Sequence, residues 1–186
     1  MSQTTFSTTV KSGKGTRHGV VSELSAFLTI KPGETDAMRG ALLRFHERVR
    51  NAPWDVIRKI GIVDMKHVIF DDGTRLAWNT AFDTDWDPYI DDSFAILGSE
   101  MWTDWVQHAV GYNPDDWHDS RPIKRFLQSA QEPAVGFYRA IPDLTLSQVK
   151  KAQQVMAAFE EVLDTPGAAE ALQNPVLKPL LDVAAG

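Results

Sequence analysis

Apolar and polar residues alternate with a period of two between Glu23 and Lys31, which predicts a β-strand with one apolar face. After Pro32-Gly33 the apolar residues recur at helical spacing, and this predicts a helix over residues 34–50 and a shorter one over 54–60. Acidic residues near the start of the first helix and arginines near its end suit the helix dipole.

Two extended runs follow at 62–70 and 75–82, joined by a segment that contains Asp72-Gly73, a strong hairpin signal. One long helix is expected over 86–109, then a loop over 113–122. The remaining expectations are a short helix at 123–129, a fourth strand at 134–141, a helix with a regular apolar stripe at 145–163, and a short helix before Pro175.

This order of elements predicts the α+β class with a ferredoxin-like βαββαβ fold. An antiparallel four-stranded sheet has helices on one face, and extra helices follow at the C-terminus. The other sheet face then needs a cover. By analogy with other proteins of this fold, two subunits press these faces together as a homodimer and enclose a cavity, forming a dimeric α+β barrel.

Several stretches resemble a bacterial group within the dimeric α+β barrel superfamily. They are VIFDDGTRLAWNTAFDTDWDPYIDD (68–92), GYNP (111–114), FYRAIPDLTLSQV (137–149) and VLD (162–164). Relatives in this group often carry His-x-x-Arg on the second strand, whereas this chain has Val63 and Lys66 there. It therefore keeps a cation but has lost the imidazole.

The resemblance implies a cavity for a small molecule. The superfamily includes cofactor-free quinone-forming monooxygenases, small polyketide cyclases and haem-degrading monooxygenases. It also includes the haem proteins of the chlorite dismutase and dye-decolourising peroxidase kind, whose Gly-x-x-Asp-Gly signature does not occur here. Haem-degrading relatives place an axial histidine on the second helix, and His108 falls near the end of that predicted helix.

Composition narrows the class of protein. The 186 residues are 43% hydrophobic, carry a net charge of −6 and contain no cysteine. The absence of cysteine excludes disulfides, thiolate metal sites and a cysteine nucleophile. Net negative charge argues against nucleic-acid binding, and no apolar run is long enough for a membrane helix. These features predict a cytoplasmic globular protein.

The charge is distributed unevenly. Residues 1–22 contain Lys11, Lys14 and Arg17 and no acid, so they carry +3 and the rest of the chain carries −9. The segment is rich in Ser, Thr and Gly and offers few large apolar groups to bury. We therefore expect a flexible basic arm at 1–22, or an arm that crosses onto a partner subunit, followed by one ferredoxin-like domain at 23–186.

Acidic residues and histidines show no metal-site spacing. Asp83, Asp85 and Asp87 begin like a calcium loop, but the glycine and glutamate that such a loop needs are absent. No H-x-x-x-H occurs, so no metal site is predicted. Among the histidines, His46 is expected to be exposed and His67 to be a hydrogen-bonded core residue.

Two histidines are candidates for chemistry. His108 is the candidate axial ligand of a haem, or else a cation that suits a helix C-terminus. His118 lies between Trp117 and Asp119 in a predicted loop, where it could be a general base oriented by a carboxylate, or else a surface histidine.

Strand parity supplies a second set of candidates. Phe27, Lys66 and Asn79, with Tyr138, can share one sheet face, where they could bind a phenolate or enolate and stabilise negative charge. The opposite choice of face would instead present His67, Trp78 and Arg139. Tryptophans suit a flat apolar ligand and suit core or interface packing equally well. The candidate substrate-binding residues are Phe27, Trp78, Trp105 and Arg139, and the candidate catalytic residues are Lys66, Asn79, Tyr138 and His118.

Three hypotheses follow. The first is a small-molecule enzyme that acts on an apolar aromatic or polyketide-like compound in a barrel cavity. Its reaction is an oxidation, for which a cofactor-free mechanism is one option. The second is a haem-binding protein, with haem held by His108 or His118. The third is a non-catalytic ligand-binding or assembly protein whose aromatic surface is an interface.

Overall fold

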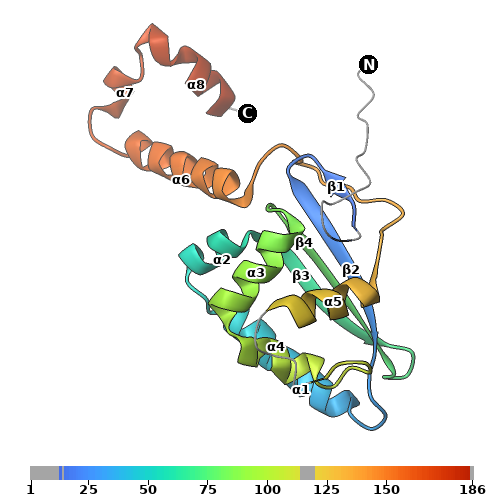
Figure 1. Cartoon of the computed structure of the whole chain (residues 1–186). Coiled ribbons are helices and arrows are strands. Elements are labelled where there is room, and N and C mark those ends of the chain that lie inside the picture. The colour runs from blue at the N-terminus through green and yellow to red at the C-terminus, as the bar shows by residue number, and fades with distance from the viewer. Residues whose placement is uncertain (1–12, 14, 114–119, 185–186) are drawn as a thin grey trace. The chain divides into compact units, whose positions relative to one another are not determined.

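The computed structural model describes residues 13, 15–113 and 120–184. The chain divides into two compact units, Met1–Leu146 and Ser147–Gly186, and each is described by itself (Figure 1). Most of the predicted arm lies outside the described residues. Its last part belongs to the sheet of the first unit, because Arg17–His18 form a short strand and Val21 begins the next one.

The first unit contains an antiparallel sheet. Its strands are β1 (Arg17–His18), β2 (Val21–Thr29), β3 (Ile62–Phe70), β4 (Arg75–Phe82) and β5 (Gln131–Glu132). β2 pairs with β4, β4 pairs with β3, and β1 and β5 both pair with the other edge of β2. The spatial order β5-β2-β4-β3 is that of a ferredoxin-like βαββαβ unit, so the predicted α+β fold class is confirmed.

Five helices accompany this sheet: α1 (Thr35–Arg50), α2 (Trp54–Ile60), α3 (Trp86–Leu97), α4 (Ser99–Val106) and α5 (Ser120–Ala130) (Figure 1). The buried core joins the helices to alternate residues of the central strands, including Leu24, Ala26, Leu76 and Trp78. The helices therefore cover one face of the sheet, as predicted.

The predicted hairpin between β3 and β4 is confirmed, with Phe70 paired to Arg75. The turn places Asp71, Asp72 and Gly73 in the left-handed region, with φ of 50°, 51° and 86°. Aspartate tolerates this region better than most residues and glycine enters it freely, which explains why Asp-Asp-Gly forms the turn.

The single helix expected over 86–109 is wrong, because the chain forms α3 and α4 instead. Gly98 separates them with φ 92° and ψ 146°, a conformation that no helix contains. The residues after α4 leave the helix, and Ala109 forms a bridge with Ile30 at the end of β2. The glycine was visible in the sequence, but the apolar spacing on both sides of it concealed the break.

The fourth strand expected over 134–141 is also wrong. The strand in that place is the two-residue β5, which ends just before Pro133. Proline lacks the N–H that would continue the ladder. In addition, β1 pairs with Ser22 and Val21 and so occupies the next stretch of the same β2 edge. Among the described residues, one backbone hydrogen bond joins the segment after β5 to this region, and in it the Val20 N–H donates to Pro142 O at 2.8 Å.

The second unit consists of most of α6 (Leu146–Leu163), then α7 (Ala168–Ala171), a 3-10 helix η2 (Pro175–Leu177) and α8 (Lys178–Ala184). The long helix and the extra C-terminal helices are confirmed, although the tail forms several short helices instead of one. The Asn174 side chain begins η2 by accepting from the Val176 N–H at 3.0 Å. None of the described helices has the length and apolar character needed to span a membrane.

Candidate functional site

The strand register decides which residues share a face of the sheet. Ala26, Trp78 and His67 lie opposite one another across β2, β4 and β3, and Ala26 and Trp78 are buried in the helix-covered core. The residues one position along must point the other way. Phe27, Lys66 and Asn79 therefore lie on the face opposite the helices α1 to α5 of the first unit, which we call the open sheet face.

Two rows cross the open sheet face side by side. One is polar and consists of Ser25, Asn79 and Lys66, which are direct partners across the three strands. The next row is apolar and consists of Phe27, Ala77 and Val68. Phe27 is 38% exposed and Val68 is 47% exposed, so this row presents a half-exposed apolar surface beside a cation and an amide.

A carboxylate that sequence reasoning missed supports the polar row. Glu23 is only 6% exposed, and its Oε1 accepts from the Thr16 N–H at 3.0 Å and from the Thr16 hydroxyl at 3.1 Å. The Ser25 Oγ lies 3.0 Å from Glu23 Oε2 and 3.0 Å from the side-chain amide of Asn79. The Asn79 atom that faces Ser25 is Oδ1, so the single hydroxyl proton of Ser25 has two acceptors, Glu23 Oε2 and Asn79 Oδ1. This chain of hydrogen bonds holds Asn79 in place.

Tyr138 and Arg139 lie outside the strands, in the irregular segment after β5. The Tyr138 ring is 81% exposed and lies 5.9 Å from the His18 ring. The Arg139 side chain donates to Ile141 O at 3.0 Å, and its backbone N–H donates to His18 Nδ1 at 3.1 Å. The structure therefore associates these two residues with β1, and no contact joins them to Lys66 or Asn79 among the described residues.

Trp78 and Trp105 belong to an aromatic cluster in the core. They are 1% and 0% exposed, and their rings meet at 71° with centroids 5.8 Å apart. Trp102 meets Trp78 at 68° and 5.4 Å. Among the described residues, the buried indole N–H groups of all three have no hydrogen-bond partner, and their rings are in edge-to-face or tilted contact with one another. The cluster consists of Phe45, His67, Trp78, Trp102 and Trp105.

His67 connects this cluster to a pocket at the sheet edge. Its ring stacks on Trp78 at 4° and 5.9 Å, and its Nδ1 lies 3.0 Å from His46 Nε2 on α1. Both histidines line a pocket of about 580 Å³ between α1, α2 and the free edge of β3, which we call the imidazole pocket. The expectation of a hydrogen-bonded core histidine is confirmed for His67.

His46 is partly buried, not exposed as expected. Leu43 and Val49 stand three residues away on each side, and this spacing could have placed His46 on a half-buried helix face. Burial and, secondarily, the charge of Arg50 lower the pKa of His46. Burial and, secondarily, His46 lower the pKa of His67 to about 3. Both rings are therefore neutral at pH 7.

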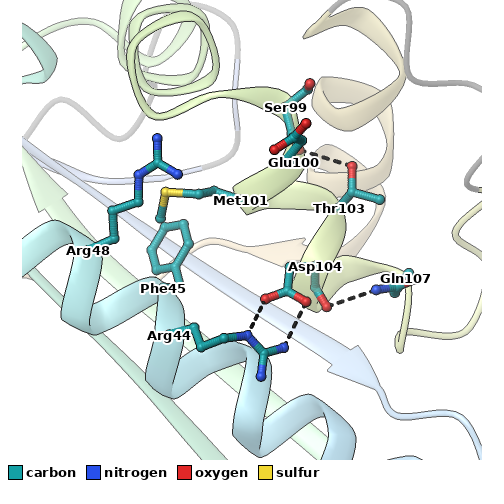
Figure 2. A pocket seen from close by; sticks show the side chains of 9 residues that line it. All are labelled: Arg44, Phe45, Arg48, Ser99, Glu100, Met101, Thr103, Asp104 and Gln107. Atoms are coloured by element: carbon teal, nitrogen blue, oxygen red, sulfur yellow. Dashed lines mark hydrogen bonds and ion pairs between the residues drawn. The ribbon is translucent and has the colours of Figure 1, made fainter.

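A second pocket of about 550 Å³ lies on the other side of α1, against α4 (Figure 2). Arg44 forms two hydrogen bonds with the Asp104 carboxylate, at 2.9 and 2.8 Å, and Phe45 and Met101 line the same pocket. Arg48 also lines it, from the same helix (Figure 2). The pocket contains no imidazole, and its bidentate ion pair is an ordinary link between two helices.

The haem candidates have different outcomes. His118 lies outside the described residues. His108 follows α4, where its Nδ1 lies 2.8 Å from Glu34 Oε2 and its backbone O accepts from the Lys31 N–H at 2.9 Å. His108 lines neither of the two pockets above. The His108 ring is bound by the Glu34 carboxylate, and nothing in the described contacts supports its role as a haem ligand. Among the described residues, no cluster of three or more potential metal ligands occurs.

Comparison with known proteins finds partial likeness to solved structures, whereas the sequence matches no protein-family model and no curated protein. A protein from Nitrosomonas europaea, assigned by name to the antibiotic biosynthesis monooxygenases, aligns over 50% of this chain and 84% of its own, at 19% identity and a TM-score of 0.38. The tetracenomycin F2 cyclase of Streptomyces glaucescens, a type-II polyketide cyclase, aligns over 63% of this chain and 97% of its own, at 14% identity and a TM-score of 0.41.

A protein from Bordetella bronchiseptica, also assigned by name to the antibiotic biosynthesis monooxygenases, aligns over 48% of this chain and 85% of its own. Its identity is 12% and its TM-score is 0.37. The ferredoxin-like fold of this chain is established by its own strand order, independently of these likenesses.

Proposed function

We propose that this protein is a small-molecule enzyme that binds an apolar aromatic or polyketide-like compound on the open sheet face. A second copy of the chain completes the cavity. The observation that carries the proposal is the pair of adjacent rows, one with Lys66 and Asn79 and the other with Phe27 and Val68. Such a surface offers an apolar wall to a flat ring and two donors to an oxygen atom at its edge.

The polar row suits an aromatic compound that carries a phenol. The Lys66 ammonium and the Asn79 amide favour the phenolate over the phenol because they stabilise negative charge on its oxygen. The hydrogen-bonded chain through Ser25 and Glu23 orients Asn79 before any ligand arrives. Preorganised donors stabilise developing charge better than solvent does, because they need no rearrangement.

The reaction in this proposal is oxidative and consumes dioxygen. A phenolate is electron-rich at the carbon para to its oxygen, and oxidation there converts the ring to a quinone. One oxygen atom of O₂ enters the product as the new carbonyl, and the other leaves as water with the two hydrogens that the phenol gives up. The ring loses four electrons and O₂ gains four. The protein's part is to bind the ring, stabilise the phenolate and exclude water.

A second copy is part of the proposal because the helices α1 to α5 lie on the other face of the sheet and leave the apolar row of the first unit partly exposed. Phe27 and Val68 are 38% and 47% exposed in the chain by itself. Electrostatic stabilisation by Lys66 is weak in bulk water and stronger where water is excluded. A partner over this face would supply the other wall and raise the effect of the cation.

The experiment is an absorbance titration of 1-naphthol with and without the protein. We expect binding to shift the naphthol-to-naphtholate midpoint downwards by about 1 pH unit, the effect of a cation close to the oxygen. Lys66→Ala, Asn79→Ala and the double variant should progressively abolish the shift. Lys59→Ala removes a matched exposed lysine of α2 and should leave the shift intact. An undiminished shift in the double variant would overturn the assignment of the open sheet face.

A further inference from the structure

The imidazole pocket shares Lys66 with the polar row of the open sheet face, but its two histidines and Arg50 have no part in the proposed function. It continues past the two histidines into a recess of about 150 Å³ lined by Arg39, Leu42 and Ile69. His46 and His67 line both cavities. Consecutive residues of β3, from Ile62 to His67, line the pocket, although their side chains alternate between the two faces of the sheet. The pocket therefore runs along the outer edge of β3, which is the end strand of the sheet.

The two histidines have a preferred arrangement of protons. His67 Nε2 is buried and has no hydrogen-bond partner in the described part of the chain, and the His67 ring meets the Trp105 ring at 69° and 5.2 Å. An N–H pointing towards an aromatic face is better accommodated there than a bare lone pair. With its proton on Nε2, His67 accepts at Nδ1 from His46 Nε2–H. His46 Nδ1 is then an acceptor that has no partner among the described residues.

The lining combines positive charge with apolar surface. Arg50 and Lys66 contribute two cations and Asp64 one carboxylate, and no ion pair joins these three residues in the part of the chain that the structure describes. Leu43 lines the pocket and is 65% exposed. The remaining apolar lining consists of Val49, Ile57, Ile62, Val63 and Met65.

We propose that the imidazole pocket binds a small carboxylate with an apolar body. Arg50 binds the carboxylate, the apolar residues from Leu43 to Ile57 contact the body, and His46 lies between them with its free nitrogen facing the ligand. A planar guanidinium suits a carboxylate because two N–H groups can bind its two oxygens. His67 is a positioning residue that fixes the His46 ring.

A metal ion is the other ligand that two adjacent histidines suggest. It is disfavoured because no third His, Cys, Asp or Glu joins them among the described residues. The histidine nitrogens that face each other are also 3.0 Å apart, in hydrogen-bond contact, which leaves no room for an ion between them. The positive lining argues in the same direction, because cations would repel one.

The test is calorimetric titration with 1-naphthoate, together with NMR spectra of the histidine rings. We expect binding in the micromolar to submillimolar range, and Arg50→Gln should weaken it by about tenfold, as loss of one charge-assisted contact would. The neutral analogue 1-naphthalenemethanol should bind the unaltered protein about tenfold more weakly for the same reason. Saturation with naphthoate should shift the His46 ring signals.

Arg48→Gln is the matched control, because Arg48 lies on the same helix, is also exposed and lines the opposite pocket (Figure 2). The affinity of the Arg48→Gln variant for naphthoate should stay within about twofold of the affinity of the unaltered protein. Equal losses in Arg50→Gln and Arg48→Gln, unmoved His46 signals, or no binding at about 1 mM naphthoate would each overturn the proposal.

Two of these variants distinguish a failure of this proposed site from a failure of the proposed function. Asn79→Ala should leave naphthoate binding unchanged, whereas Arg50→Gln should leave the naphthol shift unchanged. Lys66 is not used for this purpose, because it lies on the open sheet face and also lines the imidazole pocket. His67→Asn keeps an acceptor near the position of Nδ1 and should preserve the His46 ring signals better than His67→Leu.

Discussion

At the scale of single residues, His67 carries the most information. It sits opposite Trp78 in the strand register, stacks on that ring, and lies against Phe45 and Trp105. Its mid-strand position in the sequence predicted a core histidine. Its partner His46 comes from α1, twenty-one residues earlier, and only the packing of that helix on the strand brings the two rings together.

The stability of the fold should depend on pH through His67. The pKa of His67 falls from its ordinary value of 6.5 to about 3 in the folded protein. Between these values the unfolded chain binds a proton that the folded chain does not, so the free energy of unfolding decreases as the pH falls. At pH 5 the loss relative to pH 7 is about 2 kcal/mol from this group. His46, whose pKa is also lowered, acts in the same direction.

Urea unfolding at pH 7 and pH 5 measures this effect, with His67→Asn for comparison. The carboxylates are common to both proteins, so the difference between their pH dependences isolates the histidine. We expect His67→Asn to be less stable than the unaltered protein at pH 7 and to lose less on acidification. Identical pH dependences would show that His67 remains free to take up a proton in the fold.

At the scale of elements, the sequence predicted the β3–β4 hairpin with its boundaries, because the turn is a local structure. Asp71, Asp72 and Gly73 adopt positive φ, and Gly73 also lies against Thr35 at the start of α1. A Cβ at position 73 would approach Thr35 Cγ2 to 2.9 Å. Elements whose limits depend on distant partners, such as β5, were predicted poorly.

Gly73→Ala and Gly40→Ala form a matched pair of substitutions. At Gly73 the left-handed backbone and the approach to Thr35 should make alanine destabilising by roughly 1–2 kcal/mol. At Gly40, within α1, a Cβ meets only Arg44 Nη1 at 3.5 Å, so alanine should stabilise by about 0.5–1 kcal/mol. Thermal unfolding should move the two melting temperatures in opposite directions, and a fall in both would contradict this account.

At the scale of the whole molecule, the open sheet face is the dominant feature of the first unit. Its apolar row is half exposed, and its polar row contains a hydrogen-bonded chain that ends on a buried carboxylate, Glu23. Our proposal assigns this face to a ligand and a second copy of the chain. Its consequence is that the state of association and ligand binding change together.

Sedimentation velocity at micromolar concentration should give a dimer for the unaltered protein. Val68→Lys places a cation in the apolar row, next to Lys66 of the polar row. This variant should be a monomer, because repulsion between like charges and the loss of apolar contact both oppose association. Val110→Lys is the control, since Val110 is 50% exposed outside the sheet and should leave the dimer intact. A monomeric unaltered protein, or a dimeric Val68→Lys variant, would remove the enclosed cavity from the proposal.

The sequence by itself determined the order of the main elements, the hairpin, and the two sets of strand residues that share a face, because periodicity and turn chemistry are local. It could not say which set faces the helices, since both contain apolar and polar residues. Tertiary packing decided this by burying Trp78 against α4 and leaving Lys66 and Asn79 on the other side.

Three further results required the assembled structure. Gly98 divides a helix whose apolar spacing continues across it, β1 and β5 share one edge of β2, and His46 meets His67. Each depends on segments that are distant in sequence and compete for, or share, the same space. The physical reason is that hydrogen-bonding edges and burial are filled by whichever segment the fold brings there, and a local pattern does not contain that information.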